Sequence, residues 1–252
     1  MIVASKVSKR YGTGPVVDDV TVTLPAGGVT SIIGPNGAGK SSLLSIISRL
    51  SRPDAGRVTV DGLDVATTPG NVLARRLSIL RQDNHMTARL TVGDLVAFGR
   101  YPHSRGRLTV EDKAHVDRAL DYLSLTALRG RFLDELSGGQ RQRAFVAMVL
   151  CQDTDYVLLD EPLNNLDMKH AASMMKLLRR ASTELGKTVV MVLHDINFAS
   201  RYSDHIVAMR DGKVVCQGPP ETVITPEALR HIYDIAIQVR EIDGHRLALF
   251  YD

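Results

Sequence analysis

The sequence predicts an α/β fold in which helices flank a parallel β-sheet. Three apolar segments carry this prediction: VTSII (residues 29–33), YVLLD (156–160) and TVVMVLH (188–194). Short apolar runs of this kind are typical of strands that are buried on both faces. Helical patterns follow the first two segments, and strands that alternate with helices form parallel sheets. A glycine-rich loop, GPNGAGKS (34–41), joins the first of these strands to its helix.

The elements on either side of this loop follow from the same patterns. The residues before it alternate in the manner of strands, most clearly in VVDDVTVTL (16–24), which ends in a Pro-Ala-Gly-Gly turn. After the loop, KSSLLSIISRL (40–50) has helical spacing and stops before Pro53. GRVTVDG (56–62) then predicts another short strand.

The middle of the chain, residues 84–152, is expected to be mostly helical. Two helix starts are marked within it by Thr91 and Thr109, each followed three residues later by an aspartate, Asp94 or Asp112. A threonine N-cap with an acidic residue at the third helical position is a weak capping box.

The last third contains one long predicted helix and a predicted hairpin. Residues 167–185 have helical spacing, and Met174, Met175, Leu177 and Leu178 are expected to pack in the core. IQVREIDGHRLALFYD (237–252) alternates on both sides of Asp243-Gly244, which predicts a β-hairpin.

Composition restricts the class of protein. The chain has 252 residues, of which 44% are hydrophobic and 23% charged, as in ordinary soluble proteins. We expect it to stay in the cytosol, because it has no apolar run of membrane-spanning length and no secretory signal pattern. The net charge is +3, and the sequence contains no long run of Lys or Arg residues. We therefore expect no nucleic-acid partner. Cys151 and Cys216 are expected to be reduced thiols.

The glycine-rich loop has the spacing of a phosphate-binding loop. It fits G-x-x-x-x-G-K-[ST] and lies between a strand and a helix, which is the context that this pattern requires. Lys40 is expected to reach the β- and γ-phosphates of a nucleotide, and the Ser41 hydroxyl to ligate Mg²⁺. The expected nucleotide-binding residues of the loop are Gly34, Pro35, Asn36, Gly37, Ala38, Gly39, Lys40, Ser41 and Ser42.

Polar side chains follow three predicted strands where ligands bind in open α/β sheets, at the carboxyl end. Asp160 is expected to hold Mg²⁺ through water, and Glu161 to act as the general base for the attacking water. His194 is placed to contact the γ-phosphate. Gln82, which ends LSILRQ (77–82), is placed to contact Mg²⁺ or the water. Each residue alone is only weak evidence for a nucleotide site. Together with the phosphate loop, these residues form a specific pattern for one.

A second anion-binding feature lies a hundred residues after the first. Ser137, Gly138 and Gly139, in ELSGGQRQR (135–143), open a predicted helix. The free backbone N–H groups at this helix start form the positive end of the helix dipole, which favours a bound anion. The phosphate loop already supplies one such site, so the second needs an explanation.

With these residues in order, the chain resembles the ATPase subunits of ABC transporters over nearly its whole length. The matching positions are Tyr11 (the aromatic that stacks on adenine), Gly34 to Ser41 (Walker A), Gln82 (Q-loop), Leu136 to Gln140 (the LSGGQ signature), Asp160 and Glu161 (Walker B and base), Asn165 to Asp167 (D-loop) and His194 (H-loop). The resemblance implies that Lys40, Gln82, Glu161 and His194 take part in catalysis, and that Ser41, Gln82 and Asp160 hold Mg²⁺.

The resemblance also implies an architecture and explains the second anion site. It implies a P-loop NTPase (RecA-like) core with an antiparallel β subdomain, a helical subdomain inserted at residues 84–152 and a C-terminal β-hairpin at 236–252, all within one ATP-binding domain of residues 1–252. Two copies would pair head-to-tail. Ser137, Gly138, Gly139, Gln140 and Asp167 of one copy would then complete the ATP site of the other.

The finer resemblance is to importers of ferric siderophores, haem and cobalamin. LVAFGRYPHSRGRLTVED (95–112) and EPLNNLDMKH (161–170) resemble segments of that group, the second one those of a siderophore branch. The implied function is Mg²⁺-dependent ATP hydrolysis that powers ferric siderophore import through separate integral membrane permease subunits, with a solute-binding protein acting indirectly. The implied location is peripheral, at the cytoplasmic face of the membrane.

Two local expectations follow from this finer resemblance. Residues 91–107 are expected to contact the permease, with Arg100 and Tyr101 in that contact. Asn164 and Asn165 stand where the family usually carries small residues. The sequence therefore does not decide whether the D-loop forms the family's usual hydrogen bonds between sites or replaces them with asparagine side chains.

Three alternatives remain beside this interpretation. One is an importer of haem, cobalamin or another metal chelate. A soluble ABC ATPase acting on nucleic acid or ribosomes is less favoured, because the sequence shows no coiled coil, zinc insertion or second cassette. An ATP-binding regulator without turnover is opposed by the presence of both Glu161 and His194.

Overall fold

A six-stranded sheet with the order β10-β9-β3-β8-β7-β6 forms the centre of the molecule. In this computed structural model, which describes residues 1–12, 14–84, 88–164 and 166–250, every pairing in the sheet is parallel except that of β9 with β10. The strands are β3 (Val29–Ile33), β6 (Leu77–Leu80), β7 (Tyr156–Asp160), β8 (Thr188–Val192), β9 (His205–Arg210) and β10 (Lys213–Gly218). The predicted α/β class with a parallel core is confirmed.

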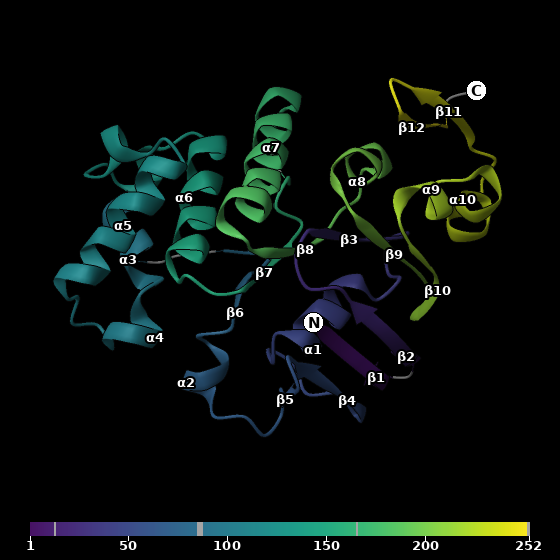
Figure 1. The fold of residues 1–252 in the computed structure, drawn as a ribbon, viewed down its shortest axis with the longest axis horizontal. Coiled ribbons are helices and arrows are strands. Elements are labelled where there is room, and N and C mark those ends of the chain that lie inside the picture. The colour runs from purple at the N-terminus through teal and green to yellow at the C-terminus, as the bar shows by residue number, and fades with distance from the viewer. Residues whose placement is uncertain (13, 85–87, 165, 251–252) are drawn as a thin grey trace.

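An antiparallel sheet with the order β2-β1-β4-β5 lies on one side of this core, with helix α1 packed beside it (Figure 1). Its strands are β1 (Ile2–Tyr11), β2 (Gly14–Leu24), β4 (Ala55–Val60) and β5 (Leu63–Asp64), and α1 spans Lys40–Ile47. This sheet is the antiparallel subdomain that the sequence resemblance implied.

Helices cover the other side of the core, and the helical middle of the chain and the C-terminal elements lie at opposite ends of the molecule (Figure 1). The remaining helices are α2 (Gly70–Leu73), α3 (Val92–Phe98), α4 (Tyr101–Ser104), α5 (Val110–Tyr122), α6 (Gly138–Cys151), α7 (Met168–Leu185), α8 (Ile196–Tyr202), α9 (Pro220–Val223) and α10 (Pro226–Tyr233), with 3₁₀ turns at Thr126–Leu128 and Leu133–Glu135. A two-stranded hairpin, β11 (Gln238–Ile242) and β12 (His245–Leu249), follows α10.

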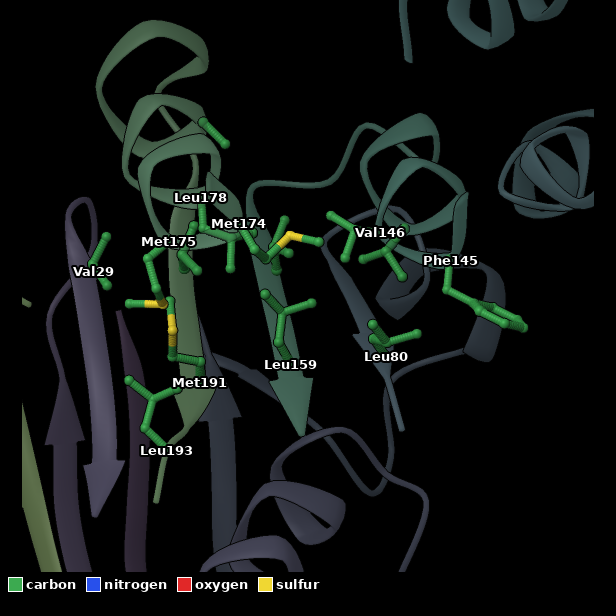
Figure 2. Packing of buried hydrophobic residues seen from close by; sticks show 14 of the residues in the cluster. Val29, Leu80, Phe145, Val146, Leu159, Met174, Met175, Leu178, Met191 and Leu193 are labelled. Carbon is green, nitrogen blue, oxygen red and sulfur yellow. The ribbon is translucent and has the colours of Figure 1, made fainter. Parts of the chain in front are cut away.

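Alternation along the central strands explains why the core has two sides. In β7, Val157 and Leu159 join the hydrophobic cluster under the helices, whereas Tyr156 and Leu158 join the cluster under the antiparallel sheet. Successive side chains of a strand point to opposite faces, so one short apolar run serves both clusters. The cluster under the helices includes Met174, Met175 and Leu178 of α7, as predicted (Figure 2).

Local signals fix where several elements begin. Thr91 and Thr109 cap α3 and α5, and each forms the predicted capping box with the aspartate three residues later. In the C-terminal hairpin, Asp243 and Gly244 have φ values of 51° and 73° and lie between the paired residues Ile242 and His245. Positive φ at both central residues is the signature of a type I′ turn, which suits the twist of a hairpin.

The expected position of Arg100 is wrong. Its side chain is only 6% exposed, because Nε donates to Asp112 Oδ1 at 2.9 Å and Nη1 donates to the carbonyl oxygen of Cys151 at 3.1 Å. The buried Arg100 side chain, at the start of α4, therefore links α4 to α5 and to the end of α6 through hydrogen bonds. The neighbouring Tyr101 is 61% exposed, as a contact residue has to be.

The subdomain boundaries at residues 84–152 and 236–252 stay predictions. Residues 85–87 and 251–252, which belong to these two segments, lie outside the described residues, and so does Asn165 of the expected D-loop. Within the described ranges, every helix is too short or too polar to cross a bilayer.

Candidate nucleotide-binding site

The phosphate loop runs from the end of β3 to the start of α1 and is held closely by its surroundings. Gly34 and Gly39 have φ values of 143° and 94°, a backbone region that other residues rarely adopt. A Cβ atom at Gly34 would lie 2.0 Å from the carbonyl oxygen of Met209, and one at Gly39 would lie 2.2 Å from that of Val16. The glycines are therefore required by both conformation and space, and they allow the loop to turn back over the sheet.

Lys40, the first residue of α1, is buried and directed into this loop. Its Nζ donates to the carbonyl oxygens of Gly34 at 2.8 Å and Pro35 at 2.9 Å. Burial lowers the pKa of Lys40, while the charges of Glu161 and Asp160 act in the opposite direction. An ammonium group held at the centre of a phosphate loop is suited to bind the outer phosphates of a nucleotide.

Ser41 and Asp160 bring oxygen atoms together beside Lys40. The Ser41 hydroxyl donates to Asp160 Oδ1 at 2.8 Å, although the two residues are 119 positions apart. Burial raises the pKa of Asp160, and the hydrogen bond from Ser41 acts against this rise. A carboxylate that is destabilised by burial next to a hydroxyl gains from a bound cation.

The donor atoms fit Mg²⁺, which prefers oxygen ligands and is usually held by one or two protein groups together with phosphates and water. Among the described residues, the structure shows no group of three or more His, Cys, Asp or Glu side chains able to hold a metal ion by themselves. The pair of Ser41 and Asp160 is thus the kind of partial site that phosphate oxygens complete.

Glu161 lies at the centre of the polar side chains that follow the strands. Its carboxylate accepts from Gln82 Nε2 at 2.7 Å, and it pairs with His194 Nε2, also at 2.7 Å. The predicted site residues from the ends of β6, β7 and β8 are therefore brought together.

One residue of this site was missed by the sequence analysis. The side-chain amide of Asn164 also donates to Glu161 Oε2. The signal was the sequence EPLN itself, because a turn that starts at Glu161 returns the fourth residue to the first. Glu161 itself has a φ of 51°, which is uncommon for a residue with a side chain and marks a strained turn.

Tyr11 is the last residue of β1, which lies between β2 and β4 in the antiparallel sheet. It pairs with Gly14, two residues before Val16, whose carbonyl lies against the phosphate loop. The side chain is 55% exposed, and its hydroxyl lies 3.2 Å from Ser51 Oγ. Lys9 Nζ lies over its ring, 5.6 Å from the centroid. The expected stacking of Tyr11 on adenine stays a prediction.

The second anion-binding feature is the start of α6. Ser137 caps this helix: its Oγ accepts from the backbone N–H of Gln140 at 3.3 Å, and its own N–H donates to Gln140 Oε1 at 3.0 Å. Gly138 and Gly139 form the first helical residues, so their N–H groups stay at the open end. Across the described ranges, no hydrogen bond or ion pair joins these residues to the phosphate loop.

The start of α7 lies against this feature. Asp167 caps α7 by accepting from the N–H of His170 at 2.8 Å, and His170 Nδ1 lies 2.7 Å from the same oxygen. A Cβ atom at Gly139 would lie 3.0 Å from the His170 ring. The structure therefore groups the residues predicted to act in trans at the adjacent starts of α6 and α7.

Comparisons with known proteins identify the family. A family profile described as "ABC transporter" matches residues 17–164, more than half of the chain. The chain is 53% identical over 251 residues to the petrobactin import ATP-binding protein YclP of Bacillus subtilis (strain 168), with 100% of both chains covered. It is 43% identical over 231 residues to the ferric enterobactin transport ATP-binding protein FepC of Escherichia coli (strain K12), covering 91% of this chain and 85% of that protein.

Solved structures give the same result for the fold. A dimeric ATP-binding cassette in a post-hydrolysis state, bound to ADP and Pi, matches with a TM-score of 0.78 and 28% identity over 87% of this chain and 99% of that one. A putative metal-chelate type ABC transporter in an inward-facing conformation matches with a TM-score of 0.84 over 99% of this chain and 97% of that one, at 24% identity. From the sequence motifs, the fold and these relatives together, the chain belongs to the ABC transporter family, as an ATP-binding protein.

Proposed function

We propose that this chain hydrolyses ATP to power the import of a ferric siderophore through a separate membrane permease. One observation carries the substrate class: the 53% identity, over the whole length of both chains, with a petrobactin import ATP-binding protein. Relatives at 38–43% identity that are named for enterobactin and iron(3+)-hydroxamate transport support the same class.

The proposed chemistry assigns a role to each group of the site. Tyr11 stacks on adenine, the backbone of residues 34–39 surrounds the phosphates, and Lys40 binds the outer ones. Glu161 takes a proton from the attacking water, and His194 contacts the γ-phosphate. Because Glu161 lies beside both Gln82 and His194, the groups that position water and phosphate are already adjacent.

Mg²⁺ is proposed as the cofactor at Ser41, Gln82 and Asp160. The Ser41 hydroxyl and the Asp160 carboxylate are already in contact, and the Gln82 amide reaches the neighbouring Glu161. When bound with a nucleotide, the ion supplies positive charge to the β- and γ-phosphates.

The proposed partners follow from the separation of the two anion-binding features. A second copy would place Ser137 to Gln140 and Asp167 over the γ-phosphate that the first copy holds at Lys40. Permease subunits would bind the exposed part of residues 91–107, which includes Tyr101, and a solute-binding protein would deliver the chelate on the other side. The chain would then act at the cytoplasmic face of the membrane.

Uptake measurements in cells test this function. We compare the wild-type strain with a strain that carries the Glu161→Gln variant. Uptake is measured for ⁵⁵Fe-labelled siderophores, and separately for haem and for cobalamin. We expect uptake of at least one ferric siderophore to be lost and uptake of haem and cobalamin to be unchanged. Loss of haem or cobalamin uptake alone would assign a different chelate, and unchanged uptake of all of them would reject the import function.

A further inference from the structure

The carboxylate of Glu161 is more completely hydrogen-bonded than a free general base needs to be. Oε1 pairs with His194, while Oε2 accepts from both Gln82 and Asn164. The residue is also 9% exposed and has a left-handed backbone conformation, with a φ of 51°. Its orientation is therefore set by its three partners and by the turn that it begins.

The three partners differ in how firmly they are tied to Glu161. Gln82 and His194 come from other strand ends, and the proposed function directs both toward the nucleotide. Asn164 belongs to the same turn as Glu161, because its backbone N–H donates to the Glu161 carbonyl oxygen at 3.2 Å. A second bond holds this turn from outside, since Gln142 Nε2 of α6 donates to the carbonyl oxygen of Pro162 at 2.9 Å.

We propose that Asn164 is a positioning residue for ATP hydrolysis, whose side-chain amide keeps the Glu161 carboxylate aimed at the attacking water when Gln82 and His194 turn to the nucleotide. The inference rests on the proposed role of Glu161 as the general base. It goes beyond that role by assigning a function to Asn164, for which the family resemblance left the hydrogen bonding open.

The chemistry of the amide explains why asparagine fits this position. Its NH₂ group donates to the carboxylate oxygen and leaves the remaining lone pairs of the carboxylate for water. An aspartate of the same size could only accept, and it would place a second negative charge against Glu161. A serine or alanine would be too short to keep the contact. The position therefore requires a donor of this length.

The experiment compares Asn164→Asp and Asn164→Ala with the wild-type protein in the assembled transporter. We expect kcat for ATP hydrolysis to fall roughly tenfold or more in both variants, because a misplaced catalytic group loses rate. The loss in Asn164→Asp should be at least as large as in Asn164→Ala. KM for ATP should change less than twofold, since the phosphate loop is untouched. Asn71→Asp, at an exposed site on α2, is the matched control and should keep the wild-type rate.

The split between kcat and KM separates positioning from a general loss of structure. In Asn164→Asp, the donor is lost and a second negative charge lies against Glu161. In both variants kcat should fall while KM for ATP and the unfolding midpoint stay close to the wild-type values, because the phosphate loop and the backbone of the turn are unchanged.

Several outcomes would overturn the inference. An unchanged or faster kcat in Asn164→Ala would mean that the amide does not position the base. A parallel loss of kcat, ATP affinity and thermal stability in both variants would mean that Asn164 only maintains the turn. Glu161→Gln, measured beside these variants, tests separately whether Glu161 is the general base. If Glu161→Gln keeps full hydrolysis, the proposed base is wrong and the role of Asn164 fails with it. If Glu161→Gln loses hydrolysis but the Asn164 variants keep the wild-type rate, only the role of Asn164 fails.

Discussion

At the scale of single residues, Arg100 shows how a charged side chain can stabilise the protein from inside. It lies 5% exposed between α4, α5 and the end of α6, and its partners are the Asp112 carboxylate and the carbonyl oxygen of Cys151. Arginine suits such a place because its planar group presents several donors in fixed directions. Its role concerns stability, and the expected contact with a permease is left to exposed neighbours such as Tyr101.

Replacing Arg100 by methionine is expected to lower the free energy of unfolding by about 3 kcal/mol, because Asp112 would remain buried without its charged partner. Urea unfolding of the isolated chain measures this change. Arg129→Met is the matched control, since Arg129 pairs with Asp117 at similar sequence separation, but both side chains are at least half exposed. That control should cost less than about 1 kcal/mol. Equal effects in the two variants would contradict the role assigned to Arg100.

The same pair gives a prediction for pH. Hydrogen bonding from the backbone of Thr109, together with Arg100, lowers the pKa of Asp112 to about 2, against the opposing effect of burial. A carboxyl with a lowered pKa in the folded state stabilises the protein above its unfolded pKa of about 3.9. This contribution should be lost as the pH falls from about 4 toward 2. Asp112→Asn should flatten that part of the stability profile, measured by thermal unfolding at several pH values.

The proposed catalytic positions could be named from the sequence because their immediate sequence neighbours define them. Lys40 and Ser41 belong to one continuous motif, and Asp160, Glu161 and His194 each end an apolar run. The buried position of Arg100 was not predictable, since it depends on how α4 and α5 pack against α6. The contact of Asn164 with Glu161 depends on rotamers within a turn, and the sequence patterns did not specify it.

At the scale of elements, helix starts and the tight turn were easier to predict than strands β9 and β10. The capping boxes at Thr91 and Thr109 and the turn at Asp243-Gly244 are local, so a few residues specify them. Residues 196–233 received no prediction, and they form α8, the β9–β10 hairpin, α9 and α10. Strand β9 is specified by its pairing with β3, which is distant in sequence.

Close packing between helices gives an element-scale prediction at Gly99, the C-cap residue of α3. A Cβ atom there would lie 2.1 Å from the carbonyl oxygen of Met148 and 3.1 Å from Cys151 Cβ. Gly99→Ala should therefore push α3 away from α6 and destabilise the protein by about 1–3 kcal/mol. Gly130→Ala is the control, because a Cβ at Gly130 has no neighbour within 4 Å. Similar unfolding midpoints for the two variants would show that the helices adjust without cost.

At the scale of the whole molecule, the arrangement of the two anion-binding features is the central fact. The phosphate loop joins β3 to α1, on the side of the sheet that the antiparallel subdomain covers, while Ser137 begins α6 among the helices of the other side (Figure 1). In the proposed function, each feature supplies only part of a nucleotide site. A head-to-tail pair of chains would join the loop of one copy to the helix start of the other, twice.

The Glu161→Gln variant tests this pairing because it separates binding from chemistry. Loss of the general base should slow hydrolysis by about 10²- to 10⁴-fold. The amide keeps the size of the side chain and removes a negative charge next to the γ-phosphate, so the closed pair should accumulate. We expect dimers of Glu161→Gln with ATP and monomers with ADP, measured by size-exclusion chromatography or crosslinking of assembled complexes.

Adding Ser137→Arg to Glu161→Gln should abolish these dimers, because the new side chain would occupy the space over the partner's γ-phosphate. Binding of ATP to each single chain should persist, since Lys40 and the phosphate loop are unchanged, and a nucleotide-binding assay measures it. Thr183→Arg adds the same charge on the exposed face of α7 and should leave the dimers intact. If the Ser137→Arg double variant still closes with ATP as readily as Glu161→Gln, the second anion-binding feature serves some purpose other than the partner's nucleotide.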